Sequence, residues 1–88
     1  MNNIDLYGFI QGSWHLTEII TYDNSKVIYC GKAGSATASE NSPSWCIKRI
    51  TMTTVDSVQT IVEEFAEGKL QYDNVWANRK ILNYKYLI

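Results

Sequence analysis

The longest stretch that alternates between two faces, as a half-buried strand does, is residues 44–54, SWCIKRITMTT. On such a strand the side chain of Trp45 points to one face, whereas that of Ile50, an odd number of residues later, points to the other. The apolar face therefore changes side near Lys48 and Arg49, and a β-bulge at that point would explain the change. We expect this strand to be the centre of the fold.

A β-hairpin is predicted before the central strand. Residues 14–21, WHLTEIIT, alternate like a strand with one apolar face, residues 22–25 are turn formers, and residues 26–32 return as a second strand. Residues 4–10 fit a short edge strand. Residues 33–43, AGSATASENSP, have no hydrophobic pattern and predict an exposed flexible loop or an extended arm.

The chain after the central strand predicts further short elements. A turn precedes a β-branched strand over residues 58–66, and a short strand follows at 69–72. Asp73 has the position of an N-cap for one helical turn over 74–78. Residues 81–88 read as a closing strand, and its apolar character predicts that it packs on its own domain or on a neighbour.

These elements add up to one all-β domain over residues 1–88, with a loop or arm at 33–43. Regular spacing of about six to seven short strands is typical of a small antiparallel β-sandwich or a partly open barrel, here with one helical turn between Asp73 and Arg79. We expect large apolar side chains to form its core. They are Trp14, Trp45, Ile47, Phe65, Trp76 and Leu82.

Composition narrows the classes of partner. The 88 residues carry a formal net charge of −1, which provides no long-range attraction for polyanions, so nucleic acid is not an expected partner. The start of the chain lacks the features of a secretory signal, and no apolar run reaches the length of a membrane span. We therefore expect a protein made in a cytoplasm, with no membrane contact. Eleven aromatic residues, six Tyr, three Trp and two Phe, suit protein interfaces.

Candidate catalytic and metal-binding residues are few. His15, Cys30 and Cys46 are the soft ligands, they fall on three predicted strands, and a structural zinc site usually takes four such ligands. A nucleophilic cysteine would need His15 and an orienting acid beside it. The predicted hairpin could place His15 near Cys30, but such a neighbourhood is more often an accident of a hairpin. Glu63 and Glu64 are adjacent on a strand and so face opposite sides. We therefore expect buried free thiols, no metal, no cofactor and no enzymatic activity.

Aromatic and basic residues near the end of the chain are candidates for an interface. Arg79 follows Trp76 by three residues, which places the guanidinium within reach of the indole face on a helical turn. A basic aromatic face of this kind also occurs in single-strand nucleic-acid binders, in which Lys80 and Lys85 would take part. The interface candidates are Arg49, Arg79, Tyr84 and Tyr86.

A set of short motifs runs from Lys26 to Tyr84. The pattern combines a Trp-x-Ile-x-Arg strand, an Ala-Asp-Gly turn, an aromatic-Asp-Asn-hydrophobic-Trp-x-x-Arg segment and a terminal Leu-x-Tyr. This chain departs from the pattern at Glu67, where Asp is more usual. The pattern is carried by Trp45, Ile47 and Arg49, by Ala66, Glu67 and Gly68, by Tyr72, Asp73, Asn74, Val75, Trp76 and Arg79, and by Leu82 and Tyr84. In this combination the chain resembles small structural proteins of tailed bacteriophages and prophages.

The resemblance implies a non-enzymatic virion module, such as a tail, collar, fibre or capsid-decoration component. It implies that the protein is assembled into the virion in the host cytoplasm, with other virion proteins and further copies of itself as partners. We expect edge strands at residues 4–10 or 81–88 to pair with neighbouring subunits. A second hypothesis is a soluble β domain that binds a small ligand or carbohydrate, with Trp14 and the tyrosines at the mouth of a barrel.

Overall fold

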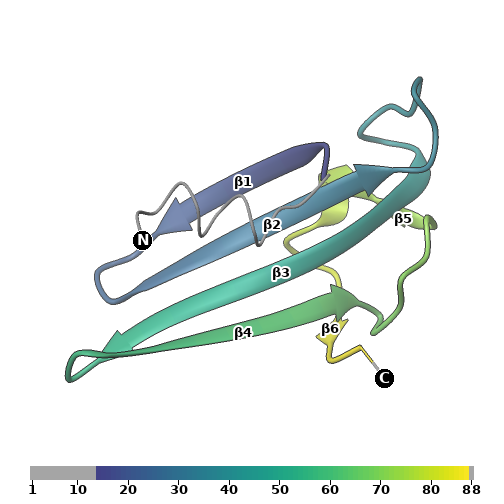
Figure 1. Cartoon of the computed structure of the whole chain (residues 1–88). Helices are drawn as coiled ribbons and strands as arrows, with labels where there is room; N and C mark the ends of the chain where they lie inside the picture. The colour runs from purple at the N-terminus through teal and green to yellow at the C-terminus, as the bar shows by residue number, and fades with distance from the viewer. Residues whose placement is uncertain (1–13, 88) are drawn as a thin grey trace.

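The computed structural model describes residues 14–87 of the chain, so the predicted strand at residues 4–10 and Ile88 lie outside the described residues. The described part contains six strands and one 3₁₀-helix (Figure 1). In chain order they are β1 (Leu16–Thr21), β2 (Ser25–Ala33), β3 (Pro43–Val55), β4 (Val58–Ala66), β5 (Asn74–Val75), η1 (Trp76–Asn78) and β6 (Tyr84–Lys85).

The strands form one antiparallel sheet in the order β1-β2-β3-β4-β6, and β5 pairs with the start of β3 (Figure 1). This confirms the all-β prediction, the number of strands and the helical turn between Asp73 and Arg79. The sheet is open and single, so the open arrangement is found instead of two packed sheets. No helix within residues 14–87 has the length and apolar character needed to cross a membrane.

Tight connections explain why the first four strands are neighbours in sequence and in space. Asp56 and Ser57 both have positive φ, 50° and 66°, and they join Val55 to Val58 in a two-residue turn. Two positive φ angles are typical of the type I′ turn, whose twist matches that of the flanking strands. The predicted turn at Glu67 and Gly68 also has positive φ at both residues.

Both faces of the sheet carry an apolar cluster, and this corrects the predicted bulge at Lys48 and Arg49. The pairing of β3 with β2 and with β4 continues through these two residues without a register shift, and the one irregularity of β3 lies between Pro43 and Trp45. The apolar residues move from one face of β3 to the other because β3 buries side chains on both faces between Trp45 and Lys48. A bulge is therefore not needed.

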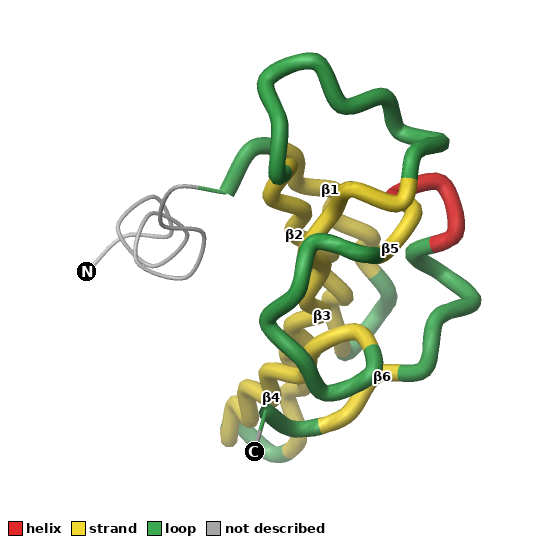
Figure 2. Tube along the Cα trace, turned by 90° about the vertical axis from the view of Figure 1, so that its right-hand side faces the viewer, coloured by secondary structure: helices red, strands yellow, loops and turns green. Residues whose placement is uncertain are grey.

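We call the two sides of the sheet the tryptophan face and the isoleucine face. The tryptophan face is the larger cluster, and it is covered by the segment after β4 (Figure 2). Its buried members are Tyr29, Trp45, Ile47, Ala66, Trp76 and Tyr84. Partly buried Trp14 packs against the isoleucine face. The buried members of this second cluster are Ile28, Cys30, Ile50 and Met52.

The segment after β4 differs from its predicted secondary structure. Residues 69–72 have no strand conformation, and the strand in this region is β5. The N-cap of η1 is Val75, with no side-chain cap, so the predicted capping by Asp73 is wrong. The closing strand over 81–88 is reduced to the two residues of β6. A three-residue 3₁₀-helix and two-residue strands make few backbone hydrogen bonds, and side-chain packing must therefore help to hold this segment.

The loop over residues 34–42 is hydrogen-bonded to the body of the domain near its middle. Trp45 Nε1 donates to the Ser39 carbonyl at 2.8 Å, and the Ala77 N–H donates to the Glu40 carbonyl at 2.9 Å. These bonds join the loop to β3 and to η1. The loop is mostly exposed, as the sequence predicts.

Candidate interaction site

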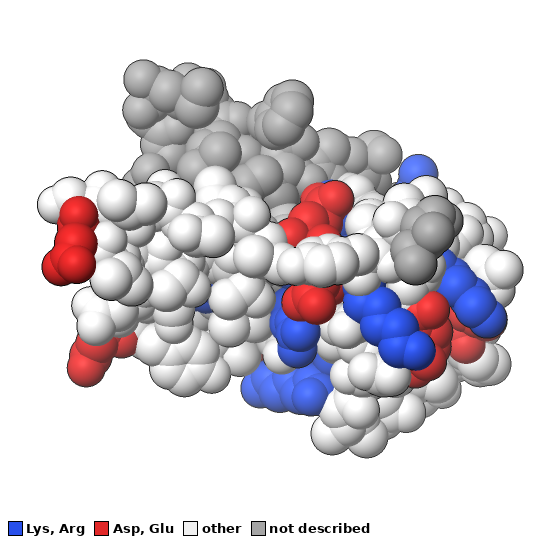
Figure 3. Space-filling model, turned by 90° about the horizontal axis from the view of Figure 1, so that it is seen from below, with Lys and Arg blue, Asp and Glu red and all other residues white. Residues whose placement is uncertain are grey.

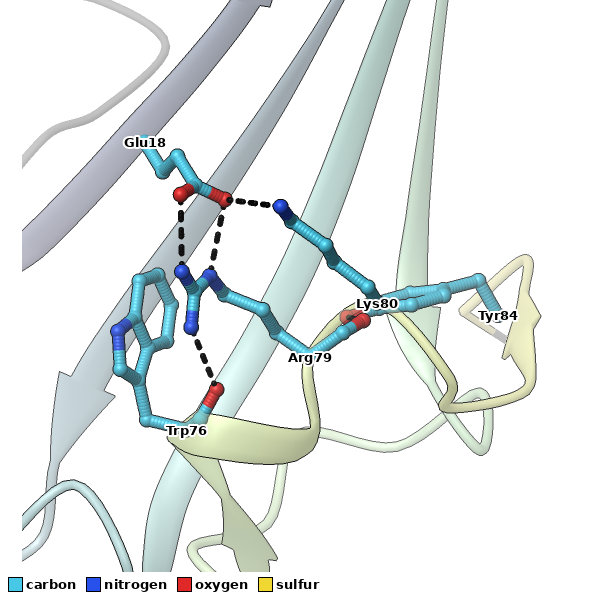
Figure 4. Close-up of polar contacts among 5 residues, drawn as sticks. All are labelled: Glu18, Trp76, Arg79, Lys80 and Tyr84. Atoms are coloured by element: carbon cyan, nitrogen blue, oxygen red, sulfur yellow. Dashed lines mark hydrogen bonds and ion pairs between the residues drawn. The ribbon is translucent and has the colours of Figure 1, made fainter.

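One guanidinium group links the segment after β4 to β1 on the tryptophan face (Figure 4). Arg79 donates from Nε and Nη2 to the two carboxylate oxygens of Glu18 on β1, at 3.0 and 2.8 Å. Its Nη1 donates to the Trp76 carbonyl at 3.2 Å, and its Cζ lies 4.8 Å from the Trp76 ring centroid. Tyr84 Oη donates to the Arg79 carbonyl at 2.6 Å. We call Glu18, Trp76, Arg79 and Tyr84 the Arg79 clasp.

The electrostatics of the Arg79 clasp follow from its two-pronged ion pair. The hydrogen bonds from Arg79 lower the pKa of Glu18, while burial opposes this shift and the charges of Arg79 and Lys80 add to it. The same hydrogen bonds raise the pKa of Arg79. Burial raises the pKa of Tyr84, so its hydroxyl stays a donor. A bidentate arginine–carboxylate pair has fixed geometry, and it therefore orients the segment as well as attaching it.

Trp76 fits because β2 has a glycine beneath it. A Cβ built on Gly31 would lie 2.5 Å from Trp76 Cε3 and 3.2 Å from Trp45 Cε3. The two indoles meet over this gap with their ring centroids 5.9 Å apart. The missing side chain at Gly31 lets both tryptophans approach the backbone of the sheet.

Among residues 14–87, no segment covers the opposite end of the sheet in this way. Residues 54–61, which form the end of β3, the turn and the start of β4, are all exposed, and we call them the hairpin tip. Val55, Val58 and Ile61 expose 61%, 64% and 45% of their surface. Figure 3 views the β4 side of the sheet: the left, where the hairpin tip lies in Figure 1, shows mostly uncharged side chains with two acidic groups at its margin, and most Lys and Arg gather at the centre and right.

The predicted chemical groups are not brought together as a reactive site. Burial raises the pKa of both the Cys30 and the Cys46 thiol, which disfavours the thiolate, and the two cysteines are free. His15 Nδ1 accepts a hydrogen bond from the Ala33 N–H at 3.0 Å. Across residues 14–87, no three His, Cys, Asp or Glu side chains group as they would around a metal ion.

The two adjacent glutamates of β4 each pair with a different cation. Glu63 accepts from Lys48 Nζ at 3.2 Å, and Glu64 accepts from Arg49 Nη2 at 2.9 Å. Lys48 is on the isoleucine face and also lies over the Trp14 ring, 4.7 Å from its centroid. The carboxylates therefore point to opposite faces, as the strand geometry predicts.

The interface candidates from the sequence lie mainly within the fold. Arg49 stacks on the Tyr84 ring, with Cζ 4.6 Å from the centroid, and Arg79 forms the clasp. Tyr84 is 8% exposed, whereas Tyr86 is 65% exposed. Sequence reasoning missed the hairpin tip. The signal was available in VQTIV at the start of β4, where apolar and polar residues do not alternate as they do on a half-buried strand.

The predicted core residues are distributed between the two faces. Trp45, Ile47 and Trp76 are buried on the tryptophan face, and partly buried Leu82 packs beside them. Phe65 is buried next to Trp14, with ring centroids 6.4 Å apart.

Comparison of the chain with models of protein families, with curated proteins and with solved structures finds no match. The resemblance to small phage proteins therefore stays a prediction.

Proposed function

We propose that the chain is a non-enzymatic structural module of a tailed-phage virion, in the tail, collar, fibre or capsid decoration, and that it acts through protein–protein contacts. The observation that carries this proposal is the bare hairpin tip with its exposed Val55 and Val58. An exposed apolar group on an open sheet edge is the kind of surface that another protein chain recognises.

The use of the charged side chains supports the same conclusion. Lys48, Arg49 and Arg79 each form an ion pair with a glutamate of the same chain. Their main role is then to hold the fold. The hairpin tip carries no lysine or arginine, and its exposed apolar side chains, Val55, Val58 and Ile61, stand among polar residues and Asp56. The net charge of −1 also provides little attraction for nucleic acid.

The second hypothesis, a ligand-binding barrel, receives less support. The sheet is open, and Tyr29 and Tyr84 are buried against each other with ring centroids 6.0 Å apart. These tyrosines do not line a mouth. We therefore propose the structural module alone.

The test measures whether the protein is incorporated into phage particles when they form. Phage particles from cells whose genome encodes the chain are purified by density gradient after induction, and their proteins are quantified by mass spectrometry. We expect the chain in the particle fraction in a fixed ratio to the major capsid protein, whereas an abundant host cytoplasmic protein is depleted. A chain that stays with the host proteins would overturn the virion proposal.

A further inference from the structure

The outer edge of β4 is open over most of its length. Within residues 14–87, β6 is the strand that pairs with this edge, and it does so at Phe65 and Ala66. Residues 58–64 therefore have no strand partner on the side away from β3 among the described residues. Unpaired backbone groups on such an edge form a template for another strand.

The direction of these backbone groups follows from the turn. Val55 and Val58 close a two-residue turn, so they form a hydrogen-bonded pair and Val58 points its N–H and C=O toward β3. Alternate residues point the other way. The Glu67 N–H agrees with this alternation, because it donates outward to the Asn83 carbonyl at 2.7 Å. The outward groups belong to Gln59, Ile61 and Glu63, which we call the free edge.

We propose that the free edge binds the free edge of a second copy, with the two β4 strands antiparallel about a twofold axis at Ile61. This inference rests on the proposed function in one respect, namely that the chain acts through protein–protein contacts. Centring the axis at Ile61 places Gln59 opposite Glu63 of the second copy, and all outward N–H and C=O groups are then paired. A shift by one residue in either direction leaves some of them without a partner.

Side chains in this register are compatible. Ile61, which is 45% exposed, packs on Ile61 of the second copy. The Gln59 amide meets the Glu63 carboxylate, and the like-charged glutamates do not oppose each other. The turn of the second copy ends beside β6, where its Asp56 carboxylate approaches the Lys85 ammonium. β6 thus limits the free edge at one end, which favours one register over its neighbours.

The first experiment measures the mass of the full chain by light scattering after gel filtration over a range of concentrations. We expect a dimer for the unmodified protein and a monomer for Ile61→Lys at the same concentrations, because two lysines would face each other across the axis. The matched control is Ile19→Lys, since Ile19 is 46% exposed on the same face but on β1, at the other end of the strand order. This control stays dimeric.

The second experiment tests the register. Gln59→Lys should lower the dimer Kd by about fivefold, because it creates two symmetry-related ion pairs with Glu63, and Gln59→Glu should raise it by a similar factor. Under mild oxidation, Ile61→Cys should give a covalent dimer. Thr60→Cys should not, because residue 60 faces residue 62 of the second copy.

Three outcomes overturn this inference: a monomer at all concentrations, a dimer that Ile61→Lys leaves intact, or cross-linking of Thr60→Cys in preference to Ile61→Cys. Each is independent of the particle test. A chain found in particles but monomeric in solution would overturn the free-edge dimer and leave the virion proposal standing. A chain absent from particles that forms this dimer would do the reverse.

Discussion

The two ends of the β2-β3-β4 sheet differ in what covers them. At one end, β3 is buried on both faces from Trp45 to Lys48, and the Arg79 clasp holds the segment after β4 over the tryptophan face. At the other end, the same strands continue into the hairpin tip, in which every residue is exposed. The pairing of β3 with β2 and with β4 is regular along its length, so the main difference lies in the cover that the segment after β4 provides. One end buries most of the apolar side chains, and the other leaves its side chains exposed.

The largest effect should come from removing the indole that covers the sheet. Trp76→Ala leaves a cavity beside Trp45 and should lower the free energy of unfolding by about 3–5 kcal/mol. Urea unfolding followed by far-UV circular dichroism measures this without relying on tryptophan emission. Tyr72→Ala is the control, because Tyr72 is 46% exposed and should change stability by less than about 1 kcal/mol. Equal losses for the two variants would contradict the comparison of the two ends.

A smaller effect is expected from filling the gap under the indoles. Gly31→Ala places a methyl group against Trp76 and Trp45 and should cost about 1–3 kcal/mol in the same urea measurement. Gly34→Ala is the matched control: its Cβ would lie 3.1 Å from Tyr72 Cβ and 3.2 Å from Cγ, a milder overlap than at Gly31 and one against a side chain that is half exposed. If Gly34→Ala proved the more damaging, the close packing at Gly31 would not be what holds this end.

The Arg79 clasp should make the covered end sensitive to acid. Because Arg79 lowers the pKa of Glu18 in the folded protein, the unfolded state binds the proton more readily, and stability falls as the pH drops through the folded pKa. The contribution of about 1–2 kcal/mol is complete above the unfolded pKa, near pH 4.3. Glu18→Gln should be less stable than the unmodified chain at neutral pH and lose less stability between about pH 5 and pH 3. Parallel pH dependences would argue against the ion pair.

The smallest effect on stability is expected at the hairpin tip. Val58→Thr removes apolar surface from a side chain that is 64% exposed and keeps the β-branched shape, so the free energy of unfolding should change by about 0.5 kcal/mol or less. The measurement is again urea unfolding, at a concentration at which the protein is monomeric. A loss as large as that of Gly31→Ala would mean that the tip contributes to the core.

The sequence predicted the elements whose pattern is local. The β1–β2 hairpin, β3, β4 and the turn at Asp56 and Ser57 follow from alternation and turn chemistry. The bulge was wrong for a physical reason: alternation identifies a face only where one side is solvated, and β3 is buried on both. Where a strand packs against an apolar cluster on each face, the alternation of apolar and polar residues does not identify one buried face.

The Arg79 clasp could not be predicted from local sequence patterns. Glu18 and Arg79 are 61 residues apart, and neither has a neighbour that signals the other. The stacking of Arg79 on Trp76 was predictable, because the three-residue spacing fits a helical turn. The predicted closing strand was too long. Tyr84 and Leu82 suggested an apolar strand face, but these side chains are at least partly buried because they pack on the tryptophan face.

The distance along the chain between Glu18 and Arg79 also sets an order of events during synthesis. A ribosome adding about 5–20 residues per second needs roughly 3–12 s to make the 61 residues that separate them. Hairpins form in about 1–10 μs, so β1 and β2 have time to pair before Arg79 is added. Arg79 follows the end of β4 at Ala66 by 13 residues, or roughly 0.7–2.6 s of synthesis, and until it is added the Arg79 clasp cannot close over Trp45 and Ile47.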